Sequence, residues 1–335
     1  MRISGLFQLF RFSLCLAAAV PSVATAVGKP SNQEISRQDL SGIVSQILKS
    51  MEAHDPGVLP LATVYKATEN SHAASLAMMT SWRTIVKAES PSLLAIDTEQ
   101  GSAFFITDIS EGNGKTEAIL RGRVKVVDQR ITELELFINR SRGDDGYAFS
   151  ATELSENYKV LMSPPKNREK ASRTELEAIG AAAWDSSDSL SVSVGDNCQF
   201  TEVGATIIDT GTYGNDSTAP LTCSWSSTRP TDLNARTSLV IDEELGFIVT
   251  NGVVQGKVYP YYGNISTFIP DSMTSAQEAQ EVWFAQVKSQ GNVTLVSSTE
   301  ATGENFEVLQ FYDNALQALQ FHVFLSGPNM TSSWV

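Results

Sequence analysis

The first half of the chain holds side chains that could transfer a proton: Asp55, Tyr65 and His72, with Trp82 close by in the sequence. Histidine and carboxylate groups act as general acids or bases when a cavity holds them against a substrate. One interpretation makes His72, Asp55 and Tyr65 catalytic. Tyr65 and Trp82 would then contact the substrate. The other interpretation is structural, because Asp55-Pro56-Gly57 is typical of a helix-ending turn and His72 can lie exposed in a loop.

A run of alternating basic residues, Arg121, Arg123 and Lys125, could in principle bind an anion. These residues alternate with apolar ones, so they share the polar face of a predicted strand. Glu133 and Glu135 occupy the matching polar face of the next predicted strand. We therefore predict Arg–Glu pairs across the two strands, on a solvated or interdomain face.

Motifs for metal ions and nucleotides are incomplete. Glu69 and His72 stand at the Glu-x-x-His spacing, but no second pair completes a set of metal ligands. Gly114-Lys115-Thr116 matches the end of a P-loop, yet Ile109 occupies the position of its first glycine. The Gly-x-Gly-x-x-Gly and Gly-x-Ser-x-Gly patterns are absent. We therefore expect no metal site and no bound cofactor.

The N-terminal 26 residues have the three parts of a secretory signal peptide. Arg2 and Arg11 precede an apolar run over residues 12–20, and Ala24-Thr25-Ala26 is a small-x-small cleavage motif. The apolar run is shorter than the roughly 20 residues that a membrane-spanning helix needs. We predict cleavage after the second of these alanines, and hence a protein of the secretory pathway, secreted or lumenal.

Composition limits the partners of the mature protein. No other stretch approaches membrane-spanning length, so we expect no membrane association once the signal is removed. About 309 residues then remain, enough for two domains. Loss of Arg2 and Arg11 changes the formal net charge from −14 to −16, which argues against nucleic acid as a partner. The oligomeric state stays open.

Two cysteines, Cys198 and Cys223, remain after signal removal. In an oxidising compartment they most simply form one disulfide, which would close a loop of about 25 residues. The alternative is a catalytic thiol, which would need a base brought close by folding. The Asn-x-Ser/Thr pattern behind a signal peptide also predicts surface glycans. It occurs at Asn139, Asn215, Asn264, Asn292 and Asn329.

The chain repeats itself. Residues 93–107 and 238–250 each predict strand, turn and strand, with Asp followed four residues later by Gly. Residues 120–139 and 306–325 each predict a hairpin with a turn at Asp128-Gln129 or Asp313-Asn314. Aligned on these turns, the alternating apolar residues of the last strands coincide, namely Leu134, Leu136 and Ile138 with Leu319, Phe321 and Val323.

Each copy also begins with a predicted helix. The first is capped by Ser36 and Asp39, and the second begins near Glu175. We divide the chain into a signal peptide (1–26), a first unit (27–162), a linker (163–172) and a second unit (173–335). The second unit has an insertion near 264–305, with a short helix near 276–287.

The second copy has its own candidates for chemistry. These are Trp184, Asp185, Glu202, Trp225, Trp283 and His322. Asp185 is expected to cap or end the helix. His322 aligns with Phe137, off the shared apolar face, so we expect it outside any cavity on that face.

An opening helix followed by a meander of long strands resembles the SnoaL-like, or nuclear transport factor 2-like, superfamily. More closely, the chain resembles fungal secreted proteins that carry a tandem version of this domain. The residues that carry the resemblance are Ala67-Thr68-Glu69-Asn70, Trp82, Asp97 with Gly101, Arg121 to Asp128, Ile131 to Glu135, Cys198, Cys223, Gly327-Pro328 and Ser333-Trp334. The resemblance implies an α+β fold of two tandem cone-shaped units, each a curved antiparallel sheet packed on its N-terminal helix around a cavity.

The resemblance also implies a function. Its members include cofactor-free isomerases, dehydratases and polyketide cyclases, as well as modules that only bind a ligand. We therefore expect a cofactor-independent isomerase, lyase or cyclase, with a pericyclic, Diels-Alderase-type reaction included. It would act on an apolar small molecule in secondary-metabolite biosynthesis. The alternative is a non-catalytic secreted glycoprotein that binds a small ligand or a partner.

Overall fold

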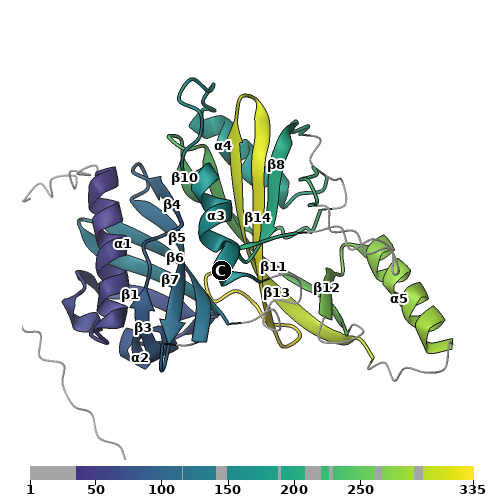
Figure 1. Ribbon diagram of the computed structural model, residues 1–335, viewed down its shortest axis with the longest axis horizontal. Coiled ribbons are helices and arrows are strands. Elements are labelled where there is room, and N and C mark those ends of the chain that lie inside the picture. Colours follow the sequence, from purple (N-terminus) through teal and green to yellow (C-terminus); the bar gives the residue numbers. More distant parts are fainter. Residues whose placement is uncertain are drawn as a thin grey trace, which may run out of the picture. The chain divides into compact units, whose positions relative to one another are not determined.

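Two curved sheets contain seven strands each, and six strands of each follow one order, while the seventh comes from a different place in each half of the chain (Figure 1). The computed structural model describes residues 35–114, 116–140, 149–187, 190–207, 220–225, 229–260, 266–289 and 297–335. The predicted signal peptide and the predicted glycan sites Asn215, Asn264 and Asn292 lie outside these residues. Residues 34–335 form one compact unit. Among the described helices, none combines the length and the apolar character that crossing a bilayer requires.

The first sheet is preceded by helix α1 (Arg37–Glu52). Its strands are β1 (Leu61–Glu69), β2 (His72–Ala73), β3 (Ile85–Ala88), β4 (Leu93–Asp97), β5 (Ser102–Glu111), β6 (Thr116–Val127) and β7 (Arg130–Asn139). The order is β2-β1-β7-β6-β5-β3, with β4 also paired to β5. The short helices η1 (Pro56–Val58), η2 (Leu76–Met78) and α2 (Thr80–Thr84) lie between these elements in the sequence.

The second sheet is preceded by helices α3 (Ala151–Leu161) and α4 (Arg173–Ala183). Its strands are β8 (Val194–Glu202), β9 (Ala205–Thr206), β10 (Arg236–Asp242), β11 (Phe247–Pro260), β12 (Ser266–Pro270), β13 (Thr299–Tyr312) and β14 (Ala315–Ser326). The order is β10-β11-β13-β14-β8-β9, with β12 also paired to β11. Helix α5 (Thr274–Ser289) follows β12. The α+β fold class with two curved sheets is thus confirmed.

The two sheets share their irregularities as well as their strand order. The hairpin register shifts between Lys125 and Val126 in the first sheet, and between Gln310 and Phe311 at the aligned place in the second. In both sheets the first strand pairs in parallel with the last strand, β1 with β7 and β8 with β14. The sheets are therefore mixed, and the prediction of purely antiparallel sheets is corrected at this one pair in each.

Local sequence explains where the opening helices begin. Ser36 and Asp39 form a capping box at the start of α1, and the side chain of Ser172 accepts from the backbone N–H of Glu175 at the start of α4. Each helix packs its apolar side on the strands that follow it (Figure 1). Residues Leu40, Val44, Ile47, Leu48 and Met51 of α1 are buried. The helices predicted from Ser36 and Glu175 are confirmed.

Helix α3 was not predicted, although Ser150 and Glu153 form a cap of the same kind. It buries Leu154 and Tyr158 in a second apolar cluster. This cluster joins the outer faces of the two sheets, where Phe137 and Phe306 meet edge to face with ring centroids 5.2 Å apart. The two sheets therefore share one core on their outer faces.

Asp97 and Asp242 connect the two copies, because each accepts hydrogen bonds from the other copy; this reciprocal set of hydrogen bonds is called the exchange below. Each carboxylate accepts a backbone N–H in its own turn, from Gln100 and Leu245 respectively, as the sequence predicted. Asp97 Oδ2 also accepts the N–H of Ile241, 3.0 Å away in the other copy. Asp242 Oδ2 in return accepts the N–H of Ile96 at 2.8 Å, so the arrangement is reciprocal.

The first residues of the two opening helices complete the exchange. Arg37 donates to Asp242 with Nη2–Oδ2 at 2.6 Å, and Arg173 donates to Asp97 with Nη2–Oδ2 at 2.9 Å. Both aspartates are buried, so their charges depend on these partners. Each turn is thereby completed by the other copy.

We predict that Asp242→Asn lowers the free energy of unfolding by about 2–3 kcal/mol, because it removes the buried carboxylate that binds the Ile96 N–H and leaves Arg37 with only the exposed Glu244 as counter-charge. Denaturant unfolding followed by circular dichroism measures the change. Glu243→Gln is the matched control, since Glu243 is exposed next to the same site. Equal stability of the two variants would show that the exchange is not needed for folding.

Candidate functional site

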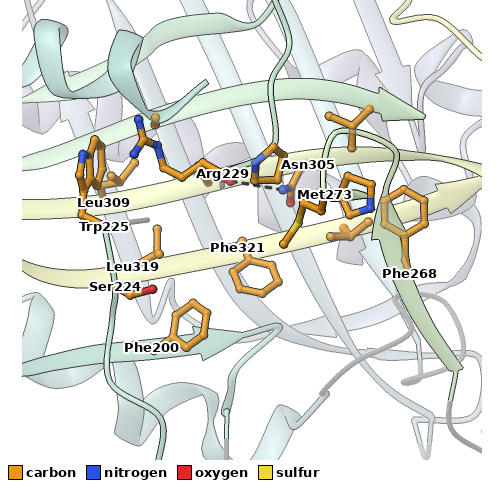
Figure 2. Close-up of a pocket in the computed structure, with 16 residues that line it drawn as sticks. Phe200, Ser224, Trp225, Arg229, Phe268, Met273, Asn305, Leu309, Leu319 and Phe321 are labelled. Carbon is orange, nitrogen blue, oxygen red and sulfur yellow. Dashed lines mark hydrogen bonds between the residues drawn. The ribbon is translucent and has the colours of Figure 1, made fainter. Parts of the chain in front are cut away.

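A cavity of about 450 Å³ lies on the inner face of the second sheet (Figure 2). Most of its lining is apolar and aromatic, which suits a small apolar ligand. Side chains from β8, β11, β12, β14 and the loop before β10 contribute, among them Phe200, Val254, Phe268, Leu319, Phe321 and Trp225.

A disulfide holds one wall of the cavity. Cys198 and Cys223 are bonded, which confirms the predicted pair. Cys198 lies in β8, and Cys223 is followed directly by Ser224 and Trp225 of the lining. The crosslink therefore ties the segment that carries Trp225 to the sheet.

Arg229 crosses from this wall to helix α4. Its guanidinium lies 4.4 Å from the ring centroid of Trp225, which is a cation–π contact. Its Nη2 donates to the carbonyl oxygens of Ala182 and Asp185, at 2.7 and 3.2 Å. These carbonyls belong to the end of the helix, where a positive charge is favourable. Arg229 therefore contributes a fixed positive charge to the lining.

The insertion in the second copy supplies the opposite wall. Phe268 and Pro270 come from β12, and Met273 precedes α5. The ring of Phe268 lies against the backbones of Gly256 and Gly303, where a Cβ atom would stand within 2.8 and 2.7 Å of ring carbons. A side chain at either glycine would displace this wall.

Glu307 is the one acidic residue of the described lining. It lies on β13, where the residue is half-buried and apolar side chains of the lining surround its carboxyl group. This burial raises the pKa of Glu307 to about 8, although the positive charge of Arg229 acts in the opposite direction. Asn305 Nδ2 donates to Glu307 Oε1 at 3.4 Å. The raised pKa of Glu307 favours its acid form at neutral pH.

In the first sheet an aromatic ring occupies the place that aligns with Glu307. Aligned on the Asp128 and Asp313 turns, Glu307 corresponds to Gly122. A Cβ atom at Gly122 would stand 2.3 Å from the Phe105 ring, so that ring occupies the place of the acidic side chain. Trp82, with 2% of its surface exposed, packs in the same apolar cluster.

The candidates predicted in the first unit do not come together. His72 and Asp55 are exposed, and Asp55 Oδ1 accepts the N–H of Gly57 in the helix-ending turn. Tyr65 is half-buried against the apolar cluster. Trp82 donates to Ser50 Oγ at 3.1 Å. The structural interpretation of His72, Asp55, Tyr65 and Trp82 therefore has the better support.

Other predicted residues are placed as follows. Glu69 accepts from the N–H groups of Thr80 and Ser81, both at 2.7 Å. Its carboxylate therefore caps the N-terminus of helix α2. The described residues contain no group of three His, Cys, Asp or Glu side chains that could hold a metal. Arg123 pairs with Glu133 at 2.7 Å, as predicted, whereas Arg121 is fully buried and donates to Asn139 on the neighbouring strand.

Of the second-copy candidates, only Trp225 lines the cavity. Trp184 is buried and donates to Thr250 Oγ1 at 2.8 Å, and Asp185 accepts from Ser187 N beyond the helix end. Glu202 and His322 are fully buried. His322 lies opposite Phe306, on the outer face, as predicted. Trp283 packs on its neighbour Phe284 in α5.

Two predicted glycan sites fall on described residues. Asn329 is exposed, as the prediction requires. Asn139 is fully buried, and its Oδ1 accepts from Arg121 Nε at 2.9 Å. The predicted exposure of Asn139 is therefore wrong, because the tripeptide pattern reports local sequence and not burial.

Sequence reasoning missed Glu307 and Asn305. The signal was present in the hairpin alignment, since both residues lie on the apolar face of β13 together with Leu309. Their partners in the first copy are Leu120 and Gly122, neither of them polar. Polar residues on an otherwise apolar face indicate a site.

No family model matches the sequence, and no curated protein matches it significantly. Among solved structures, a de novo designed protein with a curved β-sheet is 12% identical and covers 37% of this chain and 97% of its own, with a TM-score of 0.27. AclR, a candidate hydroxylase from Streptomyces galilaeus, is 11% identical over 31% of this chain and 81% of its own, with a TM-score of 0.27. A candidate SnoaL-like polyketide cyclase from Jannaschia sp. CCS1 is 8% identical over 32% and 90%, with a TM-score of 0.25.

We predict that Glu307 makes stability fall as the pH rises. Its pKa in the folded protein, about 8, lies above that of an exposed glutamate, so the folded state holds more protons between these two values. Relative to Glu307→Gln, the wild type should lose thermal stability between about pH 5 and about pH 9. Melting temperatures across this range measure the effect.

The control for this titration is Glu300→Gln, which alters an exposed glutamate near the start of the same strand. It should follow the wild type at every pH. If the difference in melting temperature between the wild type and Glu307→Gln stays constant from about pH 5 to about pH 9, Glu307 titrates like an exposed carboxyl group.

Proposed function

We propose that the cavity is the active site of a cofactor-independent isomerase, lyase or cyclase that acts on an apolar small molecule. The observation that carries this proposal is Glu307, a carboxylic acid with a pKa near 8 among aromatic and aliphatic side chains. An acid held near the working pH is suited to general acid–base catalysis.

The proposed chemistry begins with a hydrogen bond from the Glu307 carboxyl group to a carbonyl oxygen of the substrate. As solvent water removes a proton from the carbon next to the carbonyl, negative charge develops on that oxygen, and Glu307 transfers its own proton there to give the enol. The fixed charge of Arg229 lies in the same lining and favours an electron-rich transition state. The aromatic walls fold the substrate, which also suits a ring-forming, pericyclic step of secondary-metabolite biosynthesis.

We also propose that the protein folds in the secretory pathway. The Cys198–Cys223 bond supports this, because structural disulfides form in oxidising compartments. The bond anchors the Trp225 segment, so the cavity itself depends on that environment.

We predict that the protein accelerates deuterium exchange at the carbon next to the carbonyl of tetralone, a compact apolar ketone. Glu307→Gln should slow this exchange by about a hundredfold or more, because glutamine cannot give up a proton. The wild-type rate should fall as the pH rises through about 8, where the acid form is lost. Mass spectrometry of the ketone measures the exchange.

Glu300→Gln and His72→Ala are the controls and should exchange tetralone at the wild-type rate, since both positions are exposed and outside the cavity. A wild-type rate no faster than buffer, with tetralone bound, would reject catalysis. That result would favour the alternative of a secreted glycoprotein that only binds its ligand.

A further inference from the structure

Asn305 and Glu307 form the polar part of the cavity. They lie two residues apart on β13, so both side chains point to the inner face of the sheet. Asn305 is 6% exposed. Figure 2 shows its side chain among the lining residues, between Arg229 and Met273.

The amide of Asn305 is only half satisfied. Its Nδ2 donates to Glu307 Oε1, while no described residue donates to its Oδ1. The backbone carbonyl of Asn305 accepts from Asn251 Nδ2 at 3.2 Å, which holds the strand in place. A buried amide oxygen without a donor costs free energy, so such an atom in a cavity wall indicates a ligand that donates to it.

Glu307 completes the pattern. In its acid form the carboxyl group has one O–H to donate, and Asn305 already occupies Oε1. The wall thus holds a donor and an acceptor next to each other, and because the acceptor atom has almost no open surface, a neighbouring side chain must turn aside when the ligand binds. Turning the amide of Asn305 by half a rotation exchanges the two roles, because Glu307 then donates to Oδ1 and Nδ2 faces the cavity. Either way, one donor and one acceptor remain for the ligand.

Arg229 is not the anchor for the ligand. Two carbonyl oxygens at the end of α4 and the Trp225 ring already bind its guanidinium group. A ligand anion would therefore have to compete with these contacts. The Asn305–Glu307 pair faces a neutral ligand group instead.

We propose that Asn305 and Glu307 together bind a neutral ligand group with a hydrogen-bond acceptor beside a donor, as in a lactam or a hydroxyketone on an apolar ring system. The carbonyl of this group accepts from Glu307, and its N–H or O–H donates to Asn305 Oδ1. The rings lie against Phe200, Leu319 and Phe321. This inference rests on the proposed function and specifies the substrate class of the same cavity.

Isothermal titration calorimetry at about pH 6, where Glu307 is in its acid form, tests the inference with four probes of similar size. Tetralone has only the acceptor, and dihydroquinolinone is the lactam with both groups. N-methyl-dihydroquinolinone lacks the donor, and hydroxytetralone is the hydroxyketone. We expect the lactam or the hydroxyketone to bind about tenfold more tightly than tetralone and the N-methyl lactam, since one hydrogen bond to a buried acceptor is gained.

Asn305→Leu should remove this preference, because leucine has a similar size and no polar atom. The readout is the ratio of lactam to tetralone affinity within each protein, so a change in overall affinity from losing the Asn305–Glu307 hydrogen bond does not affect the comparison. Glu300→Gln should keep the full preference. Thermal unfolding checks that each variant is folded. The four probes on the wild-type protein test the paired donor and acceptor even if a variant does not fold.

Two outcomes overturn the inference. In the first, all four probes bind the wild type equally, which rejects the paired donor and acceptor but leaves the proposed function intact. In the second, Asn305→Leu retains the preference, which rejects Asn305 as the acceptor. Failure of every probe to bind would overturn the proposed function together with this inference. A preference for only one of the two bifunctional probes supports the inference and identifies the ligand group.

Discussion

The reciprocal pairing of Asp97 and Asp242 is the interaction on which both copies depend. A buried carboxylate is stable only when hydrogen bonds and a counter-charge replace water. Each aspartate obtains part of this set from its own turn and part from the other copy, namely a strand N–H and the first arginine of a helix. Neither turn is complete alone, so these hydrogen bonds join the two copies together with the apolar cluster on their outer faces.

The two sheets share their backbone arrangement but differ in the side chains on their inner faces. Six strands of each sheet follow the same order, and the hairpins share the same register shift. In the first, the Phe105 ring packs against Gly122 and fills the space. In the second, Glu307 stands at the aligned position, and the insertion adds Phe268 and Met273 as a separate wall. A few positions therefore decide which sheet can hold a ligand.

The cavity on the second sheet contains polar groups that a purely structural core would not bury. A carboxyl group in apolar surroundings loses hydration, which is why its proton is retained to higher pH. The amide oxygen of Asn305 lacks a donor among the described residues. Such departures from good folding are expected where function opposes stability. They are the reason for placing chemistry here and not at His72 or Asp55, whose side chains are exposed.

The sequence by itself determined the features that depend on neighbouring residues: the Ser36 cap, the Asp97 and Asp242 turns, the hairpins and the Arg123–Glu133 pair. These follow from local hydrogen bonding and period-2 alternation. Only the tertiary structure decided four features. These are the parallel strand pair in each sheet, the burial of Asn139, the hydrogen bonds of Asp97 and Asp242 to the other copy, and the position of the cavity on the second sheet. The parallel pairs and the Asp97–Ile241 and Asp242–Ile96 hydrogen bonds join segments far apart in the chain, and a local pattern does not specify which distant segment a strand or turn will meet.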